Sequence, residues 1–227
     1  MSQTSVRRRA VLLDLDGTLV DPKRGIVAAF RHAVAAMGGE PPPAESLNWI
    51  IGPPLRASFA KVLGAGADAE RALAAYRARY VDGEGMYDAD VYDGVPEALA
   101  ALASESRLFV CTSKPEPFAR KVVAHFGLSG FIERVYGAAL DAALDDKADL
   151  LAHLLASEGL TPKKCVMVGD RRFDVEAGAR NRVATVGVLW GYGDVEELKG
   201  ASRLCARPAE LAADVSRLAE RHGADHT

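Results

Sequence analysis

The sequence has few cysteines, no long apolar run and no excess of basic residues, and each shortage argues against a class of protein. The three cysteines, Cys111, Cys165 and Cys205, are an odd number without the spacing of metal ligands, which suits a reducing compartment. The apolar run at residues 10–13 is too short for the core of a secretory signal, and no run approaches the roughly 20 residues that span a bilayer. We therefore expect a cytoplasmic protein with no membrane partner.

The charge balance argues against a partner held by a basic surface. The 227 residues contain 28 Lys and Arg against 31 Asp and Glu, for a formal net charge of −3. Such a chain offers no basic field for nucleic acid or an anionic membrane. The basic cluster Arg7-Arg8-Arg9 is typical of a solvated tail. We expect a small-molecule partner, and the sequence leaves the choice between monomer and homodimer open.

Short apolar runs recur along the chain, and each ends in a polar residue or a glycine. The run at residues 10–15 leads into Asp-Gly-Thr, the pattern of a strand buried on both faces and followed by a turn. Segments of helical period separate the runs, and this alternation predicts an α/β fold with a doubly wound parallel sheet. The predicted strands are residues 10–15, 107–112, 134–137, 164–169 and 183–188, and the predicted helices are 95–103, 116–126, 147–157 and 175–180.

The stretch between the first two predicted strands shows no strand pattern. It contains three segments of helical period and one break rich in glycine and proline. An all-helical insert at this place is best interpreted as a separate cap. We therefore predict a core of residues 1–20 and 92–227 and a helical cap of residues 21–91. The helical segments are residues 26–37, 54–63 and 69–80, and the break is residues 38–43.

Aspartates follow two of the predicted strands. Asp14 and Asp16 are two residues apart in extended chain, so both carboxylates can point to one side just beyond the first strand. Asp170 and Asp174 follow the strand at 164–169, and they reach the same edge if the two strands are neighbours. Clustered carboxylates raise one another's pKa unless a cation is present, and hard oxygen ligands suit Mg²⁺. Magnesium is the predicted cofactor.

With a cation bound, the two aspartates after the first strand could share a phosphoryl transfer. One can attack phosphorus as a carboxylate nucleophile, and the other can protonate the leaving oxygen and then activate water. Such a transfer also needs hydrogen-bond donors and a lysine at the same edge. Thr112, the Ser113 amide and Lys147 are candidates.

Each of these residues also has an ordinary structural interpretation. An Asp-x-Asp pair is common in turns, Asp170 could cap a helix, and Lys147 could be a solvated helix lysine. These ordinary interpretations do not explain why all the candidates occur together. Every one of them lies at the end of a strand or helix, on the same predicted edge of the sheet.

These residues carry a resemblance to the phosphatases of the haloacid dehalogenase (HAD) superfamily, in order and spacing across nearly the whole chain. The phosphoglycolate phosphatase-like branch, which includes nucleotidases, is the most similar. The first motif is Asp14-Leu15-Asp16-Gly17-Thr18, the second Thr112-Ser113-Lys114-Pro115, the third Lys147, and the fourth Gly169-Asp170-Arg171-Arg172-Phe173-Asp174; the branch also shares Ile51-Gly52-Pro53-Pro54-Leu55 and His125-Phe126-Gly127-Leu128.

The resemblance implies a Rossmannoid core with an inserted all-helical cap of the C1 type. It also implies the role of each motif residue. Asp14 would be the nucleophile and a metal ligand, Asp16 the acid and base with its backbone carbonyl on the metal, and Asp170 the third ligand. Asp174 would hold metal-bound water, while Thr112, Ser113 and Lys147 would bind the phosphoryl group.

One stretch departs from the branch. Before the third-motif lysine, the branch usually has a serine, a glycine and an arginine that this sequence lacks, although the length from Gly137 to Lys147 is kept. An arginine there could contact a substrate anion, and Leu144 takes its place. This change affects the expected substrate preference and leaves the residues of the core chemistry in place.

Three further residues are candidates for the substrate site. Arg56 follows the Gly52-Pro53-Pro54 turn. Its side chain could contact the leaving group of the substrate, or it could lie on the surface of an amphipathic helix. Trp190 and Tyr192 could line the entrance through a glycine-rich loop, although packing of that loop against the core is the favoured interpretation.

The leading function is Mg²⁺-dependent hydrolysis of a small phosphate monoester, of the phosphoglycolate or nucleoside monophosphate kind, through an aspartyl-phosphate. Asp16 favours a phosphatase over a dehalogenase, which needs no acid for an alkoxide leaving group. A sugar-phosphate mutase of the β-phosphoglucomutase type uses the same core residues and stays open. A non-catalytic regulator that binds a phosphorylated metabolite is the other alternative.

Overall fold

The computed structural model describes residues 9–64, 66–140 and 144–224, and its chain forms two compact units. One unit consists of Met1–Leu19 and Tyr92–Thr227, and the other of Val20–Val91. Arg9 is the member of the N-terminal basic cluster that lies within the described residues. None of the helices in the described part of the chain is both long enough and apolar enough to cross a membrane.

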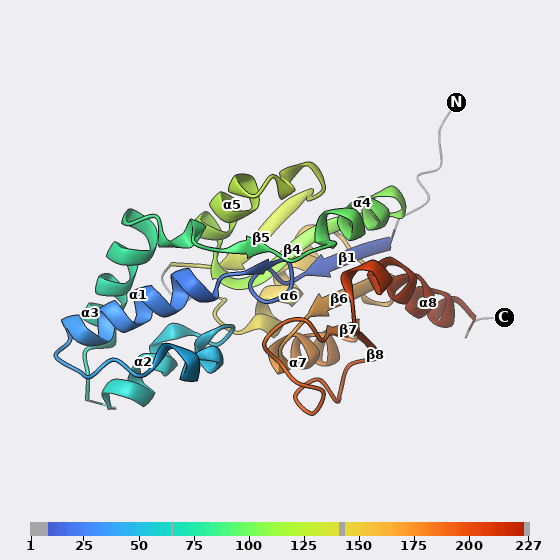
Figure 1. The fold of residues 1–227 in the computed structure, drawn as a ribbon. Coiled ribbons are helices and arrows are strands. Elements are labelled where there is room, and N and C mark those ends of the chain that lie inside the picture. The colour runs from blue at the N-terminus through green and yellow to red at the C-terminus, as the bar shows by residue number, and fades with distance from the viewer. Residues whose placement is uncertain (1–8, 65, 141–143, 225–227) are drawn as a thin grey trace. The chain divides into compact units, whose positions relative to one another are not determined.

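The larger unit is built on a six-stranded sheet in which every neighbouring pair of strands is parallel. The strand order is β5-β4-β1-β6-β7-β8, so the first strand lies in the interior and the chain winds outward in both directions (Figure 1). This confirms the predicted α/β fold with a doubly wound parallel sheet. The strands are β1 (Arg9–Leu13), β4 (Ser106–Pro115), β5 (Arg134–Ala138), β6 (Cys165–Gly169), β7 (Ala184–Val188) and β8 (Arg203–Cys205).

Helices pack on both faces of this sheet (Figure 1). On one face, α6 and α7 pack against each other and enclose a core cluster with strand residues such as Leu12, Phe109 and Met167. All three cysteines are buried and form no disulfide, so they pack as small apolar side chains. The helices of this unit are α4 (Val95–Glu105), α5 (Glu116–His125), α6 (Lys147–Ser157), α7 (Arg172–Asn181) and α8 (Leu211–Ala224), with short 3-10 turns at Leu128–Gly130, Pro162–Lys164 and Pro208–Glu210.

Local sequence explains where these elements begin. The interior of β1 is buried on both faces, which suits its run of valine and leucine. The Asp146 side chain accepts hydrogen bonds from the amides of Ala148 and Asp149 and caps the start of α6. Because Asp146 fixes that start, Lys147 is the first residue of the helix.

The register of the central strands brings their carboxyl ends to one edge. Leu13, the last residue of β1, is paired with Val110 on one side and Val168 on the other. The residues that follow these positions therefore emerge together. This edge receives the segments after β1, β4 and β6.

In the smaller unit, the described residues form helices joined by loops, with a two-stranded ladder at its ends. Its core includes Phe30, which stacks on Phe59 with ring centroids 4.5 Å apart, and Tyr76, which meets Phe59 edge-on. The helices are α1 (Lys23–Ala36), α2 (Leu55–Leu63) and α3 (Ala69–Arg77), which continues as a π-helical turn over Ala78–Asp82; 3-10 turns lie at Ala44–Ser46, Asn48–Ile50 and Gly85–Tyr87.

Two features differ from the sequence-based expectation. The insert was expected to lack strands, but β2 (Val20–Asp21) and β3 (Asp90–Val91) pair antiparallel and join the two ends of the unit. In the larger unit, the structure adds β8 and α8, which the sequence patterns do not predict. A strand of three residues is too short to show a period, so its place on the sheet edge depends on tertiary pairing with β7.

Candidate active site

Asp14 is the first residue beyond β1 and lies at the carboxyl edge of the sheet. Its amide donates a hydrogen bond to the carbonyl of Val168 at 2.9 Å, which extends the pairing of β1 with β6 by one residue. Its Oδ1 accepts a hydrogen bond from the Leu15 amide at 2.8 Å. The backbone therefore holds a buried carboxylate in one orientation where the strand ends.

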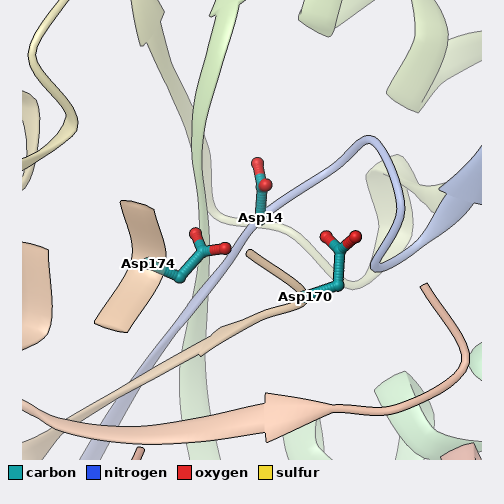
Figure 2. Close-up of side chains that lie close together, drawn as sticks. All are labelled: Asp14, Asp170 and Asp174. Atoms are coloured by element: carbon teal, nitrogen blue, oxygen red, sulfur yellow. The ribbon is translucent and has the colours of Figure 1, made fainter. Parts of the chain in front are cut away.

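Asp170 and Asp174 reach the same place from the end of β6 and the first turn of α7. Asp174 is the third residue of α7, and its Oδ2 accepts a hydrogen bond from the Arg171 amide at 3.0 Å. One oxygen from each of Asp14, Asp170 and Asp174 lies within 4.8 Å of the others, and all three residues are buried. Figure 2 shows the three carboxylates grouped beside the loop that follows β1. The structure thus brings together three of the four predicted aspartates.

Lys147 joins two of these carboxylates. Its Nζ lies 2.8 Å from Asp14 Oδ2 and 2.6 Å from Asp174 Oδ1, and its side chain is only 5% exposed. Burial acts to lower the pKa of Lys147, but attraction to Asp14 and Asp174 outweighs burial and raises that pKa well above its usual value. Lys147 is therefore a fixed positive charge at the edge of the sheet.

Asp170 is held by different partners. Its Oδ1 accepts a hydrogen bond from the Thr18 hydroxyl at 3.0 Å, and its Oδ2 accepts one from the Tyr192 amide at 2.8 Å. Burial, followed by repulsion from Asp14 and Asp174, raises the pKa of Asp170 to about 8. For Asp174, burial likewise raises the pKa, although Lys147 opposes the shift. A cation among the three would relieve both shifts.

Asp16 has its own cationic partner, which sequence reasoning missed. Both of its carboxylate oxygens accept hydrogen bonds from Lys114 Nζ, at 2.7 and 2.5 Å. Burial raises the pKa of Asp16, and the ion pair with Lys114 acts against that rise. The sequence indicates Lys114 only as part of the second motif, because a lysine after Thr-Ser carries no local signal of burial. Its contact with Asp16 joins positions 98 residues apart.

The second-motif residues lie at the end of β4. Thr112 is buried, and its hydroxyl oxygen accepts a hydrogen bond from the Lys114 amide at 3.3 Å. Ser113 is partly exposed. The register of β4 with β1 sets Thr112 two residues beyond Val110, the partner of Leu13, at the carboxyl edge.

Close backbone approaches surround the carboxylates and explain two glycines. A Cβ on Gly17 would lie 2.3 Å from Asp170 Oδ2, and Gly17 has a φ of +88°, which disfavours a side chain. A Cβ on Gly169 would lie 2.0 Å from Asp174 Cγ. The carboxylates can be grouped this tightly because both neighbouring positions lack a side chain.

Of the remaining predicted residues, Tyr192 reaches the cluster through its amide, which donates to Asp170 Oδ2. Arg56 lies on α2 in the smaller unit, where its Nε pairs with Glu70 at 2.7 Å, so its contact with substrate stays a prediction. Leu144 has a φ of +63° and packs against the core cluster of the larger unit. Residues 141–143 of the same stretch lie outside the described residues. Trp190 donates its indole N–H to the Thr18 carbonyl at 3.0 Å, which agrees with packing of its loop against the core.

The donor set fits Mg²⁺. Magnesium prefers carboxylate oxygens and retains water, and Asp14, Asp170 and Asp174 provide three such groups within reach of one ion. In addition, Asp174 Oδ1 is buried without a well-aligned hydrogen bond, although it faces Lys147. Soft ligands are absent from the described cluster, which argues against zinc or copper.

Comparison with known proteins identifies the family. Residues 11–188 match the family model described as haloacid dehalogenase-like hydrolase, which covers well over half of the chain. The chain belongs to this family of hydrolases, and the resemblance drawn from its four motifs is confirmed. With phosphatases among its relatives, it is a phosphoric monoester hydrolase.

Individual relatives carry different names. The chain is 39% identical to a 5'-nucleotidase of Pseudomonas aeruginosa over 220 residues, which are 96% of this chain and 97% of that protein. It is 43% identical to the tyrosine-protein kinase PtkA of Mycobacterium tuberculosis over 81% of this chain, but it spans only 62% of PtkA. The crystal structure of a predicted phosphatase from Clostridium acetobutylicum superposes with a TM-score of 0.87 at 32% identity, covering 92% of this chain and 99% of that one. A phosphoglycolate phosphatase of Aquifex aeolicus is 30% identical over 81% of this chain and 86% of that protein, and one of Pseudomonas putida is 28% identical over 88% of this chain and 81% of that protein.

Proposed function

We propose that this enzyme hydrolyses a small phosphate monoester with Mg²⁺ through an aspartyl-phosphate on Asp14. The observation that carries the proposal is the buried group of Asp14, Asp170 and Asp174 with Lys147 between two of its members. Three buried carboxylates repel one another unless a cation lies among them. A phosphoryl group with Mg²⁺ has the matching chemistry.

Each residue of the site has a role in this reaction. Asp14 attacks phosphorus, so an Asp14 oxygen–phosphorus bond forms while the bond to the leaving oxygen breaks. Asp16 gives its proton to the leaving oxygen, and it then takes a proton from the water that attacks the aspartyl-phosphate. That second attack releases phosphate and restores the Asp14 carboxylate.

The surrounding groups position the phosphoryl group and balance its charge. The Thr112 hydroxyl, the Ser113 amide and Lys147 bind the phosphoryl oxygens, and Lys147 also screens the charge of Asp14. Asp14, the Asp16 carbonyl and Asp170 would hold Mg²⁺, and Asp174 would hold a metal-bound water. When bound, the ion neutralises phosphoryl oxygens and keeps Asp14 ionised.

The helical unit is proposed as the cap that selects the substrate. The unit, Val20–Val91, lies in the chain between β1 and the second motif, where the sequence predicts a cap of residues 21–91, and Arg56 on α2 is its candidate contact to the leaving group. The substrate class is a small phosphorylated metabolite. The names of the relatives support nucleoside monophosphates and phosphoglycolate as the first compounds to test.

The experiment is phosphate release from a panel of esters, with Mg²⁺ and with EDTA. The panel contains nucleoside monophosphates, phosphoglycolate, phosphotyrosine and β-glucose 1-phosphate, with isomerisation of the sugar phosphate followed by NMR to detect mutase activity. We expect release that needs Mg²⁺ and is abolished by Asp14→Asn. The matched control is Asp149→Asn, an exposed aspartate of α6 that pairs with Arg180. Release that survives Asp14→Asn or EDTA would refute the mechanism.

The covalent step has its own test. Rapid acid quench of the first turnover with a ³²P-labelled ester should leave label on the denatured protein, and hydroxylamine should remove it because the linkage is an acyl phosphate. Asp14→Asn should retain no label. Label that is retained by Asp14→Asn as strongly as by the wild type would refute Asp14 as the residue that is phosphorylated.

A further inference from the structure

The segment after β7 makes contact with the loop that follows β1. The Trp190 indole N–H donates to the carbonyl of Thr18 at 3.0 Å, and these positions are 172 residues apart in the chain. The Thr18 hydroxyl in turn donates to Asp170 Oδ1 at 3.0 Å. Trp190 therefore restrains the residue that holds one oxygen of the Asp170 carboxylate.

The middle of the same segment lies directly against Asp170. The Tyr192 amide donates to Asp170 Oδ2 at 2.8 Å. On either side of it, a Cβ on Gly191 would lie 2.3 Å from the Gly17 carbonyl oxygen, and a Cβ on Gly193 would lie 2.0 Å from the Asp170 carbonyl oxygen. Only glycine allows the two backbones to approach this closely.

The far end of the segment is tied to the start of α7. Glu197 Oε1 accepts hydrogen bonds from Arg171 Nε at 2.8 Å and from the Arg172 amide at 3.1 Å. Both side chains of the Arg171–Glu197 pair are largely buried, at 11% and 22% exposure. Arg172 begins α7 and Asp174 lies in its first turn, so Glu197 restrains the backbone that carries a second carboxylate of the cluster.

We propose that residues 190–197 form a strap that holds Asp170 and the first turn of α7 in the arrangement that binds the divalent cation. Trp190 and Glu197 are then positioning residues, because the hydrogen bonds of their side chains go to Thr18, Arg171 and Arg172. Removing either contact lowers the affinity for Mg²⁺. The proposal rests on the proposed function, because it takes the carboxylate cluster to be the cation site.

The physical reason is the tight geometry that Mg²⁺ demands. The ion requires near-ideal octahedral oxygen positions, so a small displacement of Asp170 weakens binding more than it weakens the fold. Partners of metal ligands in other proteins typically change metal affinity by about 10- to 100-fold when mutated. Trp190 and Glu197 contact the neighbours of the carboxylates rather than the carboxylates themselves. We therefore expect each variant to lose about 3- to 10-fold in affinity for Mg²⁺.

The test measures Mg²⁺ binding to the substrate-free protein by isothermal titration calorimetry, beside thermal unfolding in EDTA. The variants are Trp190→Phe, which removes only the indole donor and some ring area, and Glu197→Ala. Their controls carry the same changes elsewhere: Trp49→Phe in the smaller unit, and Glu196→Ala, whose side chain is 80% exposed and pairs with Lys199. The chain has no other tryptophan, so Trp190 fluorescence in the Trp49→Phe protein gives an independent titration.

The expected result is weaker Mg²⁺ binding in both strap variants and unchanged binding in both controls. A strap that only supports the fold would lower the unfolding temperature in EDTA and leave the Mg²⁺ dissociation constant unchanged, and that outcome overturns the proposal. If one strap variant does not fold, the Mg²⁺ affinity of the other variant tests the proposal. A wild-type protein that binds no Mg²⁺ overturns the proposed function itself, which separates the two failures.

Discussion

The Lys147 ammonium lies 2.8 Å from the Asp14 carboxylate, and both side chains are almost completely buried. Lys147→Met removes the cation and leaves Asp14 and Asp174 without it. Loss of one partner from a buried ion pair costs about 3–5 kcal/mol, so metal-free protein should be destabilised by about that amount. The kcat should fall by about 10²- to 10³-fold, as for loss of a charge-stabilising donor.

Denaturant unfolding in EDTA and steady-state kinetics at saturating Mg²⁺ test this prediction. Lys163→Met, at an exposed position beside β6, is the control and should change neither quantity. If Lys147→Met kept wild-type stability in EDTA, the ion pair would not be the main interaction that holds Asp14 and Asp174 together.

Much of this site could be predicted from the sequence because strand ends are locally encoded. Asp14 and Asp170 directly follow apolar runs, and parallel strands place such positions on one edge. Lys147 could be placed because Asp146 marks the start of its helix. These signals lie within a few residues of the side chain concerned.

The parts that could not be predicted depend on contacts between distant segments. The pairing of Lys114 with Asp16 and of Trp190 with Thr18 joins residues 98 and 172 positions apart, and neither has a local pattern. The edge strand β8 is only three residues long, so pairing with β7 rather than periodicity defines it. Gly191 and Gly193, like Gly17, lie where the backbone approaches Asp170 closely, and the sequence shows only that the loop after β7 is rich in glycine.

Thr112→Val tests the hydroxyl at the end of β4. The valine keeps the shape of the buried side chain but can neither bind a phosphoryl oxygen nor accept the hydrogen bond from the Lys114 amide. We expect kcat/KM to fall by about 10²-fold and stability by about 1 kcal/mol. Thr112→Ser keeps the hydroxyl and should stay within a few-fold of wild type, so equal losses in the two variants would refute the role of the hydroxyl.

The pH dependence of the metal-free protein should report on Asp170. Its pKa is raised from 3.8 to about 8, first by burial and then by Asp14 and Asp174, so the native state binds this proton more tightly than the unfolded chain. Between about pH 4 and pH 8 this group therefore lowers stability as the pH rises. When the pH is raised from 5.5 to 8 in EDTA, the free energy of unfolding of the wild type should fall by about 1–3 kcal/mol more than that of Asp170→Asn.

Unfolding of the two proteins in EDTA at both pH values gives that difference directly. Added Mg²⁺ should stabilise the wild type more at pH 8 than at pH 5.5, because the cation competes with the proton for the carboxylates. The control Asp149→Asn should show the same pH dependence as the wild type, since Asp149 is exposed. Identical pH profiles for wild type and Asp170→Asn would contradict the raised pKa.

Gly169→Ala tests how tightly the carboxylates are packed. The added methyl would lie 2.0 Å from Asp174 Cγ, and Asp174 cannot yield freely because it is held by Lys147 and by the Arg171 amide. Overpacking of this kind costs about 1–3 kcal/mol, so the unfolding temperature should fall. Displacement of Asp174 should also weaken Mg²⁺ binding and lower kcat/KM by about 10-fold or more. The control is Gly130→Ala, where a Cβ would meet no atom within 4 Å, and it should change none of these quantities. A Gly169→Ala protein with wild-type affinity for Mg²⁺ would show that the site tolerates a shift of Asp174.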